Sequence, residues 1–154
     1  MGTFGEGMLV HWQYPVPSSG SGSQALDFGD RNGLPLHIRP YYGSNVSKFI
    51  HACMNCNYTI SIQQSLVLDT YINGIWDRQE RPRNFPFRRG EVNNATVYAG
   101  TNGFDIYAGG GAFHYHYNYR TDVTLITTVI HGYSGTHRVS VGKVSKLAKK
   151  HNVL

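Results

Sequence analysis

Short runs of alternating apolar and polar residues, broken by turn-forming residues about every 8 to 12 positions, fill most of this 154-residue chain. Tyr58, Ile60 and Ile62, for example, alternate with polar neighbours. A period of two places the apolar side chains on one face, as a half-buried strand requires. Turn signals such as Asn73-Gly74 separate these runs. The pattern therefore predicts an all-β fold, in the form of an antiparallel sandwich or barrel.

About ten strands are predicted, in a single domain (residues 1–154) without internal repeats. Residues 144–152 are the one segment with helical character. Residues 63–64 are expected to turn the chain in a tight hairpin between two neighbouring strands. The predicted strands cover residues 8–14, 34–39, 48–53, 58–63, 65–70, 92–98, 104–108, 112–119, 125–131 and 138–144, and Trp76 opens a further strand.

Composition narrows the class of protein. Charged residues form 15% and aromatic residues 13% of the chain. The low charge argues against a coiled coil, and the aromatic content argues against disorder. No stretch approaches the roughly 18 consecutive apolar residues of a membrane-spanning helix. Residues 1–8 lack the basic start and apolar run of a secretory signal peptide. The sequence therefore predicts a globular domain without membrane insertion.

The net charge of +5 is concentrated near the C-terminus. Lys143, Lys146, Lys149 and Lys150 form a short basic tail over residues 143–154. Without them, ten basic and nine acidic residues remain. A nucleic-acid-binding protein normally carries its basic excess on the folded body, so no nucleic-acid partner is predicted. A solvated terminus and a contact with an acidic partner both remain open for the tail.

Sequence motifs for catalysis are missing or incomplete. The chain has no G-x-S-x-G elbow, H-E-x-x-H helix, P-loop or dinucleotide fingerprint. Asp69, Asp77 and Glu80 are close in sequence, but a glycosidase pair also needs a defined separation between its carboxyl groups. Cys53 and Cys56 form a C-x-x-C spacing outside any predicted βαβ unit, which alone is half a zinc site. We therefore predict a protein that is not an enzyme.

Two of the eight histidines, His114 and His116, share one face of a predicted strand. A zinc site would need a further ligand, from His131 or His51. Two histidines so placed on an aromatic strand are more commonly packing or surface residues. The sequence therefore predicts neither a bound metal nor a cofactor.

Residues 76–81 read W-D-R-Q-E-R and place a Trp beside an unusual density of polar groups. A sugar ring presents C–H faces that stack on an aromatic ring, and hydroxyls that need donors and acceptors. Trp76 offers the first kind of surface. The Arg, Gln, Glu and Asp side chains offer the second, and arginine supplies a rigid fork of donors. The alternative interpretation is a structural Trp among solvated charges.

The hexapeptide resembles the W-G-x-E-x-R stretch of the galectin family, and residues 85–90 continue the resemblance with F-P-F-R-R-G. Further similar segments occur in collinear order between residues 8 and 145. These segments are residues 10–17, like the first galectin strand with its Pro-x-Pro exit; 34–38 with 48–51, like the L-x-V-x-G and x-F-x-I-N-L pair; 104–110, like F-x-V-x-V-N-G; 113–120, like F-x-x-Y-x-H-R; and 126–132, like the closing strand that ends in Gly.

The resemblance implies a jelly-roll-like sandwich of a five-stranded and a six-stranded sheet. It implies binding of β-galactosides without catalysis or metal, on a concave face over the fourth to sixth strands. The implied partners are galactose-containing glycans or glycoproteins. Useful binding at a shallow site needs several copies of the site, which favours a homo-oligomer. Galectins typically lack a signal peptide yet act outside cells, so the implied location is extracellular by that route, or cytoplasmic.

The resemblance also assigns roles to individual residues. Trp76 falls on the Trp that stacks on galactose, and Arg81 falls on the family's Arg. Gln79 falls where the family has Glu, and Glu80 beside it is expected to compensate for the lost charge. Asp69 falls on the Asn of the fifth strand. These residues are the expected carbohydrate-binding set on that side of the site.

The fourth galectin strand normally reads H-x-N-x-R, and the chain departs from this pattern. Ser61 and Gln63 are expected at the His and Asn positions, with Ser65 or nothing at the Arg position. The departure leaves the preferred glycan open. The alternative function is a galectin-fold module that binds protein, rather than sugar, through the arginine-rich residues 78–89. A structural, capsid-like jelly roll is a third possibility.

Overall fold

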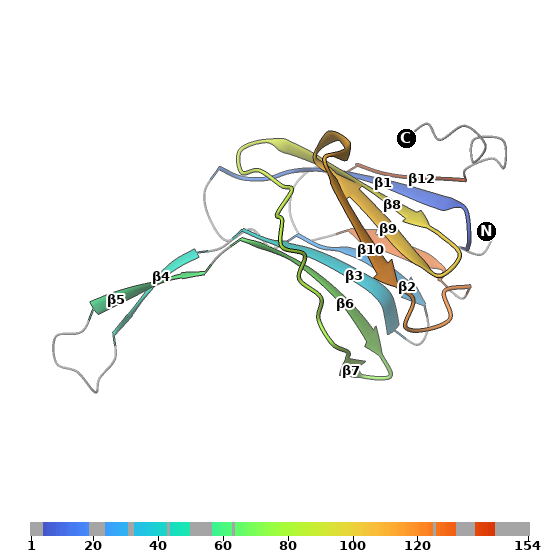
Figure 1. The fold of residues 1–154 in the computed structure, drawn as a ribbon, viewed down its shortest axis with the longest axis horizontal. Coiled ribbons are helices and arrows are strands. Elements are labelled where there is room, and N and C mark those ends of the chain that lie inside the picture. Colours follow the sequence, from blue (N-terminus) through green and yellow to red (C-terminus); the bar gives the residue numbers. More distant parts are fainter. Residues whose placement is uncertain are drawn as a thin grey trace.

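The computed structural model describes residues 5–18, 24–30, 33–42, 44–49, 57–62, 64–124, 126–131 and 138–143, and two antiparallel β-sheets pack face to face within it (Figure 1). Each of these two sheets has five strands among the described residues, where the family resemblance implied five and six. The predicted fold class is confirmed, because the chain is an all-β antiparallel sandwich.

The two sheets are built from strands that are distant in sequence. The first sheet, called the β1 sheet, contains in spatial order β10 (Phe113–Asn118), β9 (Gly103–Ala108), β8 (Val92–Ala99), β1 (Met8–Pro15) and β12 (Arg138–Lys143). The second, called the β3 sheet, contains β11 (Thr128–His131), β2 (Leu26–Asp30), β3 (Gly33–Tyr41), β6 (Ser65–Ile72) and β7 (Ile75–Trp76).

A separate two-stranded sheet of β4 (Ser44–Phe49) and β5 (Asn57–Ile62) extends away from one end of the sandwich (Figure 1). It is inserted between β3 and β6, next to the point where Tyr41 pairs with Ser65. The predicted hairpin at residues 63–64 is therefore wrong. Among the described residues β5 pairs with β4 alone, and β6 pairs with β3 and β7.

Side chains that alternate along the strands of both sheets form one core. Trp12 and Tyr14 of β1 are fully buried, and their rings stack with centroids 4.0 Å apart. Phe28 of the β3 sheet meets Phe104 of the β1 sheet with ring centroids 5.5 Å apart. Burying an apolar side chain of this size contributes about 2 to 3 kcal/mol to stability, so these contacts hold the two sheets together.

Most of the other predicted strands are confirmed to within a few residues. The strand predicted over residues 48–53 overlaps β4 at residues 48–49, and residues 50–53 lie outside the described residues. β2 was not predicted. Its sequence, L-D-F-G-D, carries Asp and Gly residues that strands ordinarily disfavour. The predicted helix at 144–152, the tail beyond Lys143, and Cys53 with Cys56 lie outside the described residues. In the described part of the chain the one helix is the three-residue turn η1 (Gly109–Gly111), far too short to span a bilayer.

Candidate functional site

A pocket of about 700 Å³ lies on the face of the β3 sheet that is turned away from the core. Strands β3, β6 and β7 and the segment that follows β7 supply its walls. The lining residues are His37, Arg39, Tyr41, Gln64, Ser65, Val67, Asp69, Trp76, Gln79, Arg81, Pro82 and Arg83.

The alternation of β3 decides which side chains reach the pocket. Ile38 is fully buried in the core, whereas His37 and Arg39 on either side of it line the pocket. β3 pairs with β6 so that His37 lies opposite Asp69 and Arg39 lies opposite Val67. Residues directly opposite each other on antiparallel strands share a face. The register therefore gathers these four side chains on one surface.

Trp76 stands at one end of this surface and is 49% exposed. The two-residue turn Asn73-Gly74, in which both residues have positive φ angles, brings β7 back alongside β6. The indole packs against Tyr71, with ring centroids 4.9 Å apart, and meets the edge of the His37 ring at 5.2 Å. These contacts fix the indole while half of its surface stays open to a ligand. β7 ends at Trp76, although Trp76 was expected to open a strand.

Asp69 provides a polar group at the floor of the pocket and is only 1% exposed. Its Oδ1 accepts a hydrogen bond of 2.8 Å from the backbone N–H of Thr70. Its Oδ2 has no hydrogen-bond partner among the described residues. An unsatisfied buried acceptor costs about 1 to 3 kcal/mol, so this oxygen is ready to accept a hydrogen bond from a ligand hydroxyl.

Three further polar side chains on the pocket wall are joined by hydrogen bonds. Arg81 donates through Nη2 to Oε1 of Gln79 at 3.0 Å and through Nη1 to Oγ of Ser65 at 2.9 Å. Gln79 and Ser65 are neutral, so these bonds orient the guanidinium and leave its charge uncompensated. The sequence prediction that Gln79, Arg81, Asp69 and Trp76 share one site agrees with this arrangement.

His37 was not among the predicted site residues. Its Nδ1 lies 2.5 Å from Oδ1 of Asp27 on β2, and both side chains are largely buried. A carboxylate partner on one ring nitrogen fixes the orientation of an imidazole and leaves Nε2 as its remaining polar atom. His37 therefore brings a preoriented polar group to the pocket.

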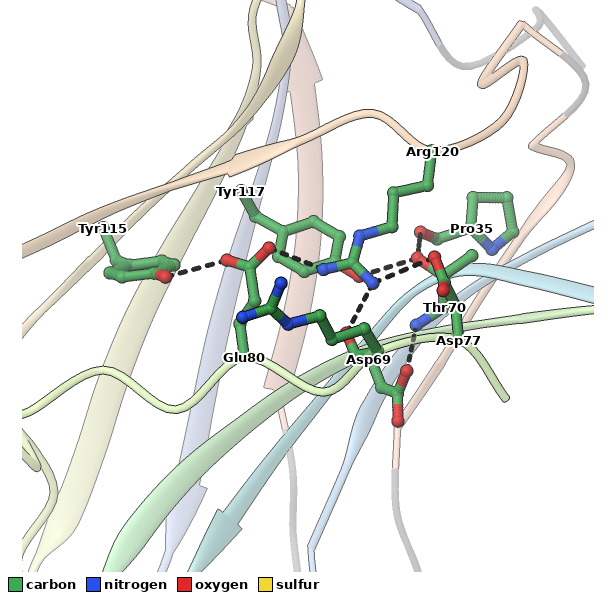
Figure 2. Close-up of polar contacts among 9 residues, drawn as sticks. Pro35, Asp69, Thr70, Asp77, Glu80, Tyr115, Tyr117 and Arg120 are labelled. Atoms are coloured by element: carbon green, nitrogen blue, oxygen red, sulfur yellow. Dashed lines mark hydrogen bonds and ion pairs between the residues drawn. The ribbon is translucent and has the colours of Figure 1, made fainter. Parts of the chain in front are cut away.

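Glu80 lies on the opposite side of the chain from Gln79 and Arg81. Its backbone pairs with Leu68, a core residue, so the two side chains share the inner face. The Glu80 carboxylate accepts hydrogen bonds from Tyr115 at 2.8 Å and from Arg120 at 2.5 Å (Figure 2). The expectation that Glu80 compensates for Gln79 inside the pocket is thus not supported by the geometry.

Arg120 holds the segment after Trp76 against the β1 sheet (Figure 2). Its guanidinium donates to Asp77 at 3.0 Å and to the backbone oxygen of Arg78, besides Glu80, and lies 4.9 Å from the centre of the Tyr117 ring. Hydrogen bonds from the Arg78 backbone and then from Arg120 lower the pKa of the Asp77 carboxyl. Arg120 is thus a positioning residue. In the sequence, it was marked by the resemblance of residues 113–120 to F-x-x-Y-x-H-R.

The three carboxylates considered as a glycosidase pair do not meet in one cleft. Asp69 is at the floor of the pocket, whereas Asp77 and Glu80 both bind Arg120. Within the described residues, no group of three or more His, Cys, Asp or Glu side chains is placed to hold a metal ion. His114 and His116 both contact Oδ1 of Asp105, at 2.9 and 3.0 Å.

The predicted site residues on the inserted hairpin are not placed in the pocket. Ser61 lies in β5 and pairs with Asn45 of β4, in a different sheet from Asp69 and Trp76. Gln63 lies outside the described residues. The polar positions expected from residues 59–63 are supplied instead by β3, which is the direct neighbour of β6.

The sequence and the fold match a known family. The family model for galactoside-binding lectins matches residues 22–144, which is most of the chain. The chain belongs to the galectin family. Human galectin-7 is 27% identical to it over 116 residues, covering 68% of this chain and 84% of that protein.

Solved galectin structures have the same fold. A toad ovary galectin in complex with N-acetylgalactose is 15% identical, has a TM-score of 0.66 and covers 90% of this chain and 92% of its own. The chicken liver protein CG-16, described as a homodimeric agglutinin, is 15% identical and has a TM-score of 0.65. The match covers 90% of this chain and 94% of CG-16. Members of the family are lectins and not enzymes, and typically occur in the cytoplasm and are secreted by a non-classical route.

The pocket shows where this galectin departs from the H-x-N-x-R pattern. β3 carries His37-x-Arg39-x-Tyr41 on the face next to Asp69. The pattern's His is present, its Asn position carries an arginine, and its Arg position carries a tyrosine. The sequence contained this partial match, but the alternating residues 58–63 gave a stronger strand signal and drew the prediction to the inserted hairpin.

Proposed function

We propose that this galectin binds β-galactoside-type glycans in the pocket of the β3 sheet. The exposed indole of Trp76 beside convergent polar groups is the observation that carries the proposal. Trp76 stacks on a C–H face of the sugar. Oδ2 of Asp69 accepts a hydrogen bond from a hydroxyl, and Gln79, Arg81 and His37 bind further hydroxyls.

The exposure of Trp76 needs an explanation that packing alone does not supply. A large aromatic side chain left half exposed loses much of the hydrophobic stabilisation that burial would bring. Trp12, the other Trp of the chain, is fully buried. A ligand ring that covers the free half of Trp76 recovers this stabilisation on binding and adds a stacking contact.

The affinity of a single site is expected to be weak, in the range of roughly 0.1 to 1 mM. A shallow pocket covers little of the ligand, and each sugar hydroxyl exchanges water for protein at small net gain. We therefore propose that several sites act together in a homo-oligomer, which raises the overall avidity. We also propose that the protein meets its glycans outside the cell after signal-independent export, and that it does not chemically alter them.

The test of sugar binding is the substitution Trp76→Ala, measured by calorimetry with lactose. The variant is expected to bind at least about tenfold more weakly, because the stacking surface is lost. Ile75→Ala is the matched control. Ile75 is the neighbouring exposed residue of β7, at 71% exposure, and does not line the pocket. The control is expected to bind lactose as the unsubstituted protein does.

Equal affinities of the Trp76→Ala and Ile75→Ala variants would refute the stacking role. A screen of immobilised glycans that stays silent even at millimolar sugar would favour the alternative, a module that binds protein. In the structure the arginines of residues 78–89 are divided, because Arg81 and Arg83 line the pocket while Arg88 pairs with Glu91 elsewhere. This division favours the sugar-binding proposal over a single protein-binding patch.

A further inference from the structure

The pocket carries more positive than negative charge. Three guanidinium groups line it, those of Arg39, Arg81 and Arg83, against the one carboxylate of Asp69. None of the three forms an ion pair with a carboxylate within the described residues. Arg81 is hydrogen-bonded only to neutral groups, as described above. The charge of the pocket is therefore left for a ligand to balance.

Two other arginines of the chain, Arg88 and Arg120, do have carboxylate partners. Arg120 is bound by two carboxylates, and Arg88 lies 3.7 Å from Glu91. Asp27, a carboxylate next to the pocket, already lies against His37. Three arginines without a carboxylate partner among the described residues thus gather on the face where the ligand is proposed to bind.

Arg39 is the most informative of the three residues. It stands where the galectin pattern has a neutral Asn, so the chain gains a cation at this position. Its cross-strand neighbour is Val67, which offers no polar partner. Arg81 lies beyond Val67, on the segment that pairs with the other edge of β6. Two guanidiniums therefore flank an apolar strip at the centre of the pocket.

The positions of these arginines relative to Trp76 indicate which part of a ligand they would meet. Along β3, Arg39 is two residues, about 7 Å, beyond His37, and the His37 ring touches Trp76. When a sugar stacks on Trp76, a substituent that extends from its ring along β3 therefore lies near these arginines. Guanidinium forks match the planar oxygens of carboxylate and the oxygens of sulfate, and an open pocket of one charge sign raises the local concentration of anions.

We propose that the preferred ligand is a galactoside that carries an oxyanion, either a sulfate ester or a carboxylate, bound by Arg39 and Arg83 together with Arg81. This inference rests on the proposed sugar binding and adds a substrate class to it. It predicts that charge on the glycan, and not only its galactose ring, decides affinity.

The test compares the dissociation constants of lactose, sulfated lactose and sialylated lactose at low and high salt. At low salt at least one of the anionic sugars is expected to bind about tenfold more tightly than lactose, and the ratio is expected to shrink as salt screens the charges. A preference for the sulfated sugar alone assigns the anion as sulfate, and a preference for the sialylated sugar alone assigns it as carboxylate.

The double variant Arg39→Gln with Arg83→Gln is expected to bring the ratio of lactose to anionic-sugar dissociation constants close to one. Arg88→Gln removes another exposed arginine, which lies outside the pocket, and is expected to keep the ratio of the unsubstituted protein. Equal affinity for lactose and both anionic sugars would overturn this inference and leave the proposed function standing. Failure of all three sugars to bind would overturn both.

Discussion

At the scale of single residues, the site depends on polar groups that the fold leaves incomplete. Asp69 is almost fully buried, yet only one of its two carboxylate oxygens has a partner among the described residues. Trp76 is half exposed although it is among the largest apolar residues of the chain. Both features reduce stability in the free protein, and a bound sugar would satisfy both at once.

Asp69→Ala is expected to weaken lactose binding about tenfold, because a ligand hydroxyl loses its acceptor. Asp69→Asn is expected to bind within about threefold of the unsubstituted protein. Its amide oxygen still accepts the Thr70 N–H, and its amide group still bonds a hydroxyl. Calorimetry on both variants checks the prediction. Undiminished binding by the Ala variant would remove Asp69 from the site.

The sequence predicted part of the site, because W-D-R-Q-E-R is a compact signal in one segment. Gln79 and Arg81 are two residues apart in an extended segment and therefore share a face, while Trp76 reaches the pocket from the end of β7. The same alternation places Glu80 on the opposite face, outside the pocket, although Glu80 was expected among the binding residues. His37 was missed because its role depends on the pairing of β3 with β6, which no local pattern specifies.

At the scale of elements, the segment after β7 is held by one arginine, Arg120, which follows the end of β10 in the other sheet. Arg120 binds the side chains of Asp77 and Glu80 and the backbone of Arg78 (Figure 2). Tyr117 links this cluster to β6 through a hydrogen bond of 2.7 Å to Thr70. These contacts fix the position of Gln79 and Arg81 at the pocket.

Arg120→Met is expected to destabilise the fold by about 2 to 4 kcal/mol, because Glu80 is left partly buried without its cation. Urea unfolding measures this loss. The variant is also expected to bind lactose more weakly, since the segment carrying Gln79 and Arg81 is less well fixed. Adding Glu80→Gln removes the uncompensated charge and is expected to restore part of the stability. A fully stable single variant would contradict the positioning role.

The inserted hairpin offers a second prediction at this scale. Because Tyr41 pairs directly with Ser65, a two-residue Asn-Gly turn in place of residues 43–63 can join β3 to β6. The shortened protein is expected to fold and to bind lactose within about twofold of the full chain. Circular dichroism checks folding, and calorimetry checks binding. A folded variant that no longer binds lactose would restore Ser61 and Gln63 to the site.

Strand positions were largely predictable from the sequence, but strand partners were not. A period of two shows that residues 58–63 form a strand and says nothing about which strand lies beside it. β5 was expected to pair with β6 because the two strands are consecutive in sequence. The strand that pairs with β6 is instead β3, which is more distant in sequence. Register follows from turns and from burial of a whole face, which are properties of the assembled sheet.

At the scale of the whole molecule, buried and partly buried tyrosines occur in the β1 sheet and in the segments that follow β3 and β10. Burial raises the pKa of Tyr42, Tyr115 and Tyr119 to about 12, and it also raises the pKa of Tyr14. Tyr14 and Tyr42 share a hydrogen bond of 3.0 Å between their hydroxyls. In the folded state these groups therefore keep their protons at a pH where the unfolded chain would release them.

The stability of the fold is consequently expected to fall in alkali. A group whose pKa is higher in the folded state contributes its full stabilisation below the ordinary tyrosine pKa of 10.0 and loses it as the pH rises towards 12. Urea unfolding midpoints between about pH 8 and pH 11.5 measure the effect. A midpoint that stays constant across this range would show that the tyrosines are not protected by the fold.

The most direct measurement of the central claim is an NMR titration with lactose that follows the two indole N–H signals. Trp76 is exposed at the pocket and Trp12 is fully buried in the core, so one protein contains both the probe and its control. We predict that the Trp76 signal shifts progressively and saturates while the Trp12 signal stays in place. A Trp76 signal that does not move, with lactose binding detected elsewhere on the molecule or nowhere, would contradict it.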